Sequence, residues 1–204
     1  MRLLLFSDLH RNLAAARALV QRSHDVDVVV GAGDFGTMRK GVDEVIQTLS
    51  AIERPAVLVP GNAESYEELM SACNAWPMAR VLHGSSAKIN GIEFWGVGGA
   101  IPETPFGSWS YDFSEMDGQR MFADCPQGAV IVSHSPPKGA VDTSSDGQSC
   151  GSVALRGTVE RTQPLLVVCG HIHDCGGQSV DISGTPVVNA GPKGIVWELV
   201  KGEA

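Results

Sequence analysis

The chain is predicted to fold as an α/β protein, because three short apolar strands alternate with three amphipathic helices over its first 75 residues. Residues 3–6, 26–30 and 56–59 are almost continuously apolar, as expected for parallel strands that are buried on both faces. The segments between them place apolar residues three and four positions apart, which is the period of a helix with one buried face. This βαβαβα order indicates a parallel sheet covered by helices.

Each of the three helices has a recognisable start or apolar face. Asn12 is expected to cap a helix over residues 13–20, because its side chain can accept a hydrogen bond from the first turn. The second helix carries its apolar residues on one face between positions 42 and 52. Ser65 followed by Glu68 has the form of a capping box, which opens the third helix.

The rest of the chain is predicted to contain shorter strands, one helix and one long loop. Asn90-Gly91 marks a hairpin turn, residues 152–162 read as a helix, and residues 101–115 are rich in proline, glycine and aromatic residues and read as a loop. Alternation of apolar and polar residues near the C-terminus predicts antiparallel strands. The strands expected after residue 80 are 81–84, 87–90, 92–99, 129–132, 165–168, 178–183, 185–190 and 195–200.

Length and composition favour one globular domain over residues 1–204, because no repeat or low-complexity linker divides the chain. The five cysteines are odd in number and irregularly spaced, which fits buried or incidental thiols better than a disulfide framework. Cys169 and Cys175 flank a pair of histidines, so a ligand role for these two stays open.

Charge and hydropathy exclude two classes of partner. The net charge is −8 and no run of lysine or arginine occurs, so a long nucleic acid is not an expected partner. No apolar run approaches the roughly 20 residues of a membrane span, and the N-terminus lacks the features of a signal peptide. A cytoplasmic protein without a membrane partner is expected, and self-association into a homo-oligomer is left open.

Polar side chains with metal-binding chemistry follow five of the predicted strands. The loops at the carboxyl ends of strands converge on one edge of an open α/β sheet, which is where such folds build their sites. Aspartates held together there would repel each other, and clustered imidazoles would lose hydration, unless a cation lay among them. These residues are Asp8, His10, Asp34, Asn62, His134, His171 and His173.

The mixture of carboxylate and imidazole predicts two divalent transition-metal ions (Mn, Fe, Zn or Ni), because Mg and Ca prefer shells made of oxygen alone. Seven donors are too many for one ion and suit two ions that share a bridging carboxylate. The Asp-x-His and His-x-His spacings are expected to place both side chains of each pair on one side of an extended segment. A polar residue after a single strand is usually an ordinary turn residue. Because the same pattern recurs after five strands, we favour a metal site over that interpretation.

These residues resemble the signature of a known family, the calcineurin-like metallophosphoesterases. Segments 105–115, 133–137 and 188–192 are similar to its small bacterial and archaeal Icc-like branch. The resemblance implies a four-layer α/β/β/α sandwich of two mixed β-sheets flanked by helices. The five blocks that carry it, in chain order, are Asp8-x-His10, Gly33-Asp34, Gly61-Asn62, His134 and Gly170-His171-x-His173.

The resemblance also implies a ligand set and an activity. The expected activity is hydrolysis of small phosphoesters, with phosphodiesters favoured, by direct attack of a hydroxide that bridges the metals. Asp34, Asn62 and His10 are the candidate catalytic residues. The implied assignment is one ion held by Asp8, His10 and His173, a second ion held by Asn62, His134 and His171, and Asp34 bridging both.

One position departs from the family pattern, which commonly has histidine after the Gly-Asn pair. Ala63 stands there instead, and it cannot stabilise or protonate a leaving group, a loss that typically lowers a rate by about 10²–10⁴. His10 could take over some proton transfer, although a metal-bound imidazole is a poor acid. We therefore expect a working hydrolase that favours good leaving groups.

Other residues admit two readings. Glu64 could support the metal ligands from behind or simply open a helix, where the helix dipole favours an acid. Trp109 and Tyr111 could stack on a nucleobase or anchor a long loop, and Lys138 could reach a phosphate or be solvated. His83 is expected to be structural or solvated.

Two rival functions share much of this pattern. A binding or scaffold protein on the same fold, with weak or lapsed catalysis, is the main alternative, but such relatives usually lose metal ligands as well. A metal amidohydrolase would use similar ligands in a different order along the chain.

Overall fold

The computed structural model describes residues 1–199, in which strands and helices alternate over the first half and strands predominate in the second. The α-helices are α1 (Leu13–Arg22), α2 (Val42–Leu49), α3 (Tyr66–Ala72), α4 (Glu115–Met121) and α5 (Val153–Thr162). The 3-10 helices are η1 (Ser23–Asp25), η2 (Cys73–Ala75) and η3 (His173–Cys175). The strands are β1 (Arg2–Phe6), β2 (Val28–Gly31), β3 (Ala56–Leu58), β4 (Ala79–Val81), β5 (Ser85–Ile89), β6 (Ile92–Val97), β7 (Val130–Ser133), β8 (Leu166–Cys169), β9 (Ser179–Ile182), β10 (Thr185–Asn189) and β11 (Ile195–Glu198).

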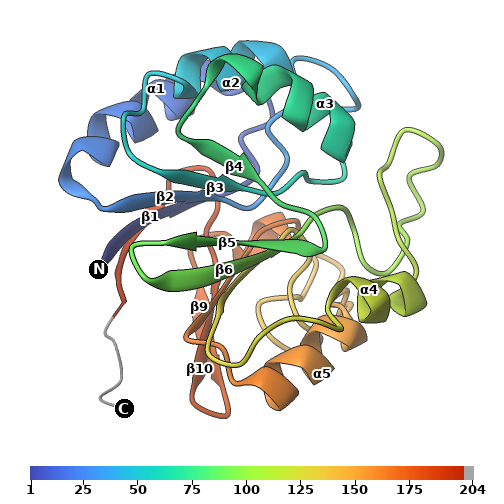
Figure 1. Ribbon diagram of the computed structural model, residues 1–204. Coiled ribbons are helices and arrows are strands. Elements are labelled where there is room, and N and C mark those ends of the chain that lie inside the picture. The colour runs from blue at the N-terminus through green and yellow to red at the C-terminus, as the bar shows by residue number, and fades with distance from the viewer. Residues whose placement is uncertain (200–204) are drawn as a thin grey trace.

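Two β-sheets face each other, and helices cover both outer faces (Figure 1). The first sheet has the strand order β11-β1-β2-β3-β4 and carries α1, α2 and α3 on its outside. The second has the order β5-β6-β7-β8-β10-β9 and carries α4 and α5. Both sheets mix parallel and antiparallel pairs. The α/β class and the four-layer sandwich of two mixed sheets are therefore confirmed.

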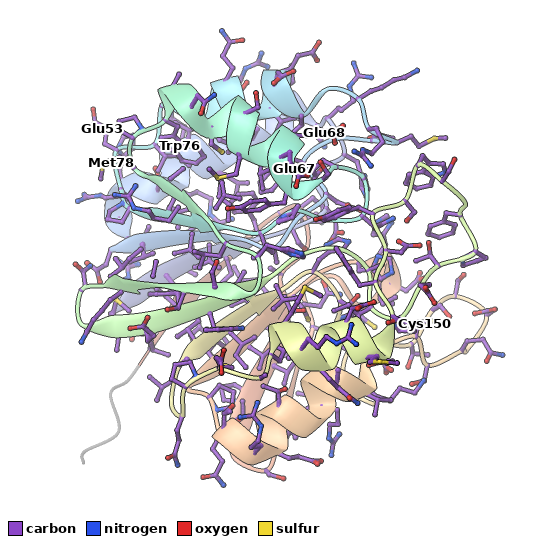
Figure 2. The ribbon with its side chains drawn as sticks, turned by 45° about the vertical axis from the view of Figure 1, so that its right-hand side comes forward. Glu53, Glu67, Glu68, Trp76, Met78 and Cys150 are labelled. Atoms are coloured by element: carbon purple, nitrogen blue, oxygen red, sulfur yellow. The ribbon has the colours of Figure 1, made fainter. Side chains whose placement is uncertain are left out.

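The strands are continuously apolar because they have two buried faces. In β1, Leu4 and Phe6 join the core beneath the helices, whereas Leu3 and Leu5 join the core between the two sheets. Side chains alternate between faces along a strand, so a strand buried on both sides needs apolar residues at every position. Trp76 belongs to the helix-facing core, where its indole N–H donates to the Ile52 carbonyl oxygen at 3.1 Å (Figure 2).

Local signals in the sequence predict several element boundaries correctly. The Asn12 side chain accepts a hydrogen bond from the Ala15 N–H at 3.0 Å and caps α1. The capping box of Ser65 and Glu68 is present at the start of α3. Asn90-Gly91 joins the antiparallel strands β5 and β6 with φ angles of 51° and 81°, the left-handed pair that a two-residue hairpin requires.

No helix is expected from the sequence around residue 118, yet α4 lies there and packs against α5. Ser114 caps it, and Gly118 allows the close approach, because a Cβ atom there would lie 3.2 Å from the Ala154 Cβ. The Glu115 side chain accepts hydrogen bonds from the Val153 and Ala154 N–H groups at the start of α5. This helix is stabilised by a neighbour 39 residues away, which local propensity does not reveal.

The C-terminal strands are only partly as predicted. β9 and β10 pair antiparallel and β11 pairs antiparallel with β1, but β10 is also parallel to β8. The predicted strand 195–200 extends to Val200, which lies outside the described residues. Of the five strands expected to present polar residues, β1, β2 and β3 belong to the first sheet and β7 and β8 to the second. Within residues 1–199, no helix has both the length and the apolar character that a bilayer crossing demands.

Candidate metal centre

The carboxyl ends of strands from both sheets meet at one end of the sandwich, and all seven predicted ligands lie there. One part of this cluster contains the buried Asp8 and Asp34, the half-buried His10 and the exposed His173, and one ligand atom from each lies within 4.8 Å of the others. The His10 Nε2 atom is 2.9 Å from the His173 Nε2 atom and 3.4 Å from Asp34 Oδ2. Two ligands held about 2.0–2.1 Å from one ion at 90–109° would be about 2.9–3.4 Å apart. These separations therefore suit a metal ion.

The buried part of the cluster surrounds His134. Its Nε2 atom is 3.0 Å from Asn62 Oδ1 and 3.5 Å from Asp34 Oδ1. The His171 ring lies beside it, with 4.9 Å between ring centroids. Asp34 thus presents one carboxylate oxygen to His134 and the other to His10.

Hydrogen bonds decide which imidazole nitrogen faces the cluster. The Nδ1 atom of His134 is 2.8 Å from the Ala32 carbonyl oxygen, and Nδ1 of His10 is 3.1 Å from the Gly36 carbonyl oxygen. A carbonyl oxygen only accepts, so in each neutral ring the proton is on Nδ1. The Nε2 lone pair then points into the cluster. Metal-binding histidines are usually oriented in this way, by a hydrogen bond that the other ring nitrogen donates to a carbonyl or carboxylate oxygen.

The amide of Asn62 is oriented by residues that sequence reasoning did not single out. Its Nδ2 donates to Ser110 Oγ at 2.9 Å, and Ser110 Oγ donates to Asp112 Oδ1. The Asn62 carbonyl oxygen is therefore turned toward the His134 Nε2 lone pair. Two lone pairs 3.0 Å apart repel each other unless a cation or a proton lies between them.

Four of the predicted ligands adopt left-handed backbone conformations. The φ angles are 56° at Asp8, 44° at His10, 57° at Asp34 and 66° at His171. A side chain in this region costs about 1–2 kcal/mol, and such strain concentrates at functional sites. The expectation of an extended Asp-x-His or His-x-His segment is wrong, because β1 and β8 end before these residues and η3 begins at His173. The two histidines after β8 consequently reach different parts of the cluster.

The glycines before the ligands permit very close approach of the loops. A Cβ atom at Gly61 would lie 2.0 Å from Asp34 Oδ1, and one at Gly170 would lie 2.5 Å from Asp8 Oδ2. No real Cβ atom tolerates such contacts, so any other residue would push the carboxylates out of place. The Gly-Asn and Gly-His pairs are therefore steric requirements of the cluster.

Comparison with known proteins decides the family. The calcineurin-like phosphoesterase superfamily domain matches residues 1–201. The chain belongs to this superfamily. Human and mouse metallophosphoesterase domain-containing protein 1 are each 31% identical to this phosphoesterase-family chain over 141 residues, 65% of the chain and 39% of the relative. The chain thus spans about two fifths of the length of these relatives.

Solved structures of low sequence identity share the fold of this superfamily member. The protein TT1561 of Thermus thermophilus has a TM-score of 0.74 at 18% identity, covering 98% of this chain and 99% of that one. A dimetal phosphatase from Danio rerio has a TM-score of 0.63 at 16% identity, covering 93% and 86%. An archaeal phosphodiesterase has a TM-score of 0.56 at 15% identity, covering 94% and 84%.

Glu64 supports the metal centre of this phosphoesterase domain from behind. Its side chain is buried and accepts hydrogen bonds from the N–H groups of Asp34 (2.9 Å), Phe35 (3.3 Å), Gly36 (2.9 Å) and Gly61 (2.7 Å). One carboxylate therefore ties the loop after β2 to the loop after β3. Glu68, not Glu64, completes the cap of α3, so the reading of Glu64 as a helix-opening acid is wrong.

Ala63 contributes its backbone to the centre. Its N–H donates to Asp34 Oδ1 at 2.8 Å and so holds the carboxylate between the two parts of the cluster. The methyl group borders the open cavity above the ligands. The small residue at this position therefore leaves the Asp34 support intact.

The charges of the cluster fit a bound cation. Burial, followed by the Asp8 carboxylate, raises the pKa of Asp34 even though His134 opposes this. Burial raises the pKa of Glu64 to about 7, and the Asp34 carboxylate adds to the effect. Burial, with the neighbouring His134 ring, holds the pKa of His171 well below its usual range. Crowded acids beside an uncharged imidazole are the arrangement that a divalent cation stabilises.

The structure also shows the surroundings of the other residues for which the sequence allowed two interpretations. Trp109 lines the cavity, whereas Tyr111 packs edge-on against Phe113 at 4.8 Å and belongs to an aromatic cluster that also holds His83. The His83 Nδ1 atom accepts a hydrogen bond from the Gly98 N–H at 3.1 Å, which supports its structural reading. Lys138 donates to the Ser149 carbonyl oxygen and does not line the cavity.

Proposed function

We propose that this chain is a metal-dependent phosphoesterase that acts on small phosphoesters, phosphodiesters above all, at a centre of two divalent transition-metal ions. One observation carries the proposal. Imidazole, carboxylate and amide donor atoms from five strand ends lie 2.9–3.5 Å from one another, and two of these residues, His10 and Asp34, have left-handed backbone. Bound divalent cations would offset the repulsion between these donors. Membership of the superfamily supplies the reaction class.

The residues divide between the two proposed ions according to the clusters they form. Bound ions would attract the phosphate oxygens and make a water molecule more acidic. Asp34 would contribute to both ions, and the donor sets would be Asp8, His10 and His173 for one ion and Asn62, His134 and His171 for the other.

The chain's own side chains would orient the substrate and exclude water. His10, Asp34 and Asn62 border the cavity and would contact the phosphate from three sides. Ala63 offers no proton to a leaving group, so esters of acidic alcohols should be hydrolysed faster than esters of alcohols that leave poorly. The partner of the site is a small phosphoester, with neither a long nucleic acid nor a membrane involved, and the location we propose is the cytoplasm.

Metal analysis and hydrolysis assays test the proposal together. The protein, stripped with a chelator and reloaded separately with Mn²⁺, Ni²⁺ and Zn²⁺, should bind two ions per chain and hydrolyse aryl phosphodiesters faster than aryl monoesters. Binding of one ion or none would contradict the metal centre. Two bound ions without turnover of any ester would favour the binding or scaffold alternative.

A further inference from the structure

A cavity of about 620 Å³ opens directly beside the metal centre. Its floor is formed by ligands, among them His10, Asp34 and Asn62. Its walls come from the turn at Thr37-Met38, from residues 102–109 and from residues 144–150. The loop between β6 and α4 projects from the side of the sandwich (Figure 1), and Cys150, which also lines the cavity, lies on that side (Figure 2). The cavity is far larger than a phosphate group requires.

The walls of this cavity carry exposed apolar side chains. Met38 is 54% exposed and Phe106 is 50% exposed. The rings of Phe106 and Trp109 stack nearly parallel, with 5.6 Å between centroids and 7° between planes. Stacking on each other fixes both rings without burying them in the core. Exposed apolar groups gathered around a concave site are typical of a ligand surface.

Charge limits what the same walls can bind. Among the described residues 1–199, none that lines the cavity is lysine or arginine, and the lining includes Glu103 and Asp174. A second phosphate or carboxylate on the substrate would find no cationic partner in these walls and two acids nearby. The part of the substrate beyond the reacting phosphate is therefore uncharged or cationic.

We propose that the substrate is a phosphoester carrying a single phosphate and a planar ring, which the stacked Phe106 and Trp109, together with Met38 in the lining of the same cavity, hold beside the metal centre. The inference rests on the proposed phosphoesterase function and names its substrate class. An aryl group and a nucleobase share this chemistry. Esters of simple aliphatic alcohols and compounds with further anionic groups are poor substrates.

The first test compares two esters whose alcohols have similar acidity, phenyl methyl phosphate and hexafluoroisopropyl methyl phosphate. Only the first has a ring. For Phe106→Ala and Trp109→Ala, the ratio of kcat/KM between the two esters should shift about 5- to 100-fold against the phenyl ester, the usual range for loss of one stacking partner. Adenosine 5′-methylphosphate and benzyl methyl phosphate, which both have poor leaving groups, are compared as competitive inhibitors of phenyl methyl phosphate hydrolysis, and the lower inhibition constant distinguishes a nucleobase from a simple aryl group as the preferred ring.

A matched pair of methionines controls for general damage. Met38 lines the cavity, whereas Met116 lies on α4 outside the cavity lining and is 60% exposed. Met38→Ala should shift the same ratio several-fold, and Met116→Ala should leave it unchanged. A ratio that stays constant in all three cavity variants, or that shifts equally in Met116→Ala, overturns the proposal.

Binding of inert ligands separates this proposal from the proposed function. Calorimetry on the metal-loaded protein should show phenylphosphonate binding at least about fivefold more tightly than methylphosphonate, with the difference abolished in Trp109→Ala. Tighter binding of phenylphosphonate without hydrolysis of any ester would support a ring-binding site at Phe106 and Trp109 and contradict the proposed phosphoesterase activity. Hydrolysis of esters, with equal affinity for phenylphosphonate and methylphosphonate, would support the phosphoesterase activity and overturn the proposed ring-binding site.

Discussion

The two halves of the candidate metal centre are built differently, as His134 and His173 illustrate. The His134 side chain is completely buried and its ring is held by the Ala32 carbonyl. The His173 side chain is 61% exposed and starts a 3-10 helix in a loop. Burial and the Ala32 carbonyl oxygen restrict the orientation of the His134 ring. His173 lines the cavity, where substrate and solvent arrive, whereas His134 is not part of the cavity lining.

Asp34 joins these halves, so its replacement should have the largest effect. Asp34→Asn should lower kcat/KM at least about 10³-fold, because one change weakens charge stabilisation by both ions. Steady-state kinetics with metal analysis measures this against the exposed control Asp27→Asn, which should behave like the unmodified protein. Near-normal turnover of Asp34→Asn would mean that the halves do not share a bridging carboxylate.

Glu64 is not among the proposed ligands, but its carboxylate accepts hydrogen bonds from the loops after β2 and β3, which carry Asp34 and Asn62. Glu64→Gln replaces one accepting oxygen by an N–H₂ group that would face a backbone N–H. We expect metal affinity and activity to fall about 10- to 100-fold, the usual effect of removing support behind a ligand. Glu67→Gln, on the exposed face of α3 (Figure 2), is the matched control. Unchanged metal affinity in Glu64→Gln would assign Glu64 to stability alone.

The stability of the metal-free protein should separate the halves directly. His134→Ala removes a buried ring and leaves the Ala32 carbonyl and the Asp34 carboxylate without their partner, so the free energy of unfolding should fall by about 2 kcal/mol. His173→Ala removes an exposed ring and should change it by less than about 0.5 kcal/mol. Denaturant titration after chelation measures both. Equal losses would mean that the difference in burial between His134 and His173 has no effect on stability.

Ala63→His should have the smallest effect and a selective one. The new ring would reach the cavity beside the cluster, where a departing oxygen would lie, so hydrolysis of an alkyl phosphoester should rise about tenfold or more. An aryl leaving group departs with little help, and its rate should change little. The ratio of kcat/KM for p-nitrophenyl and alkyl esters measures this. No gain on either ester, with metal content unchanged, would show that the proton comes from another group.

Local patterns in the sequence were sufficient for the parts of the fold that depend on near neighbours. Continuous apolar runs predicted the buried strands, and side-chain caps such as Asn12 and Ser65 predicted the starts of helices. The position of each polar residue after a strand predicted which side chains would meet, because strand ends converge in α/β folds. All seven proposed ligands were found in this way, and their convergence is what the structure adds.

Only the tertiary structure decided the features that depend on contacts between distant residues. Glu64 reaches N–H groups up to 30 residues away, and Glu115 caps a helix 39 residues further along. The left-handed turns at the ligands and the cavity beneath Phe106 and Trp109 likewise arise where separate loops meet. Local periodicity carries no information about such meetings, because they depend on how two sheets pack against each other. The sequence alone therefore predicted the candidate donors, and the packing determined the hydrogen bonds that support them and the cavity beside them.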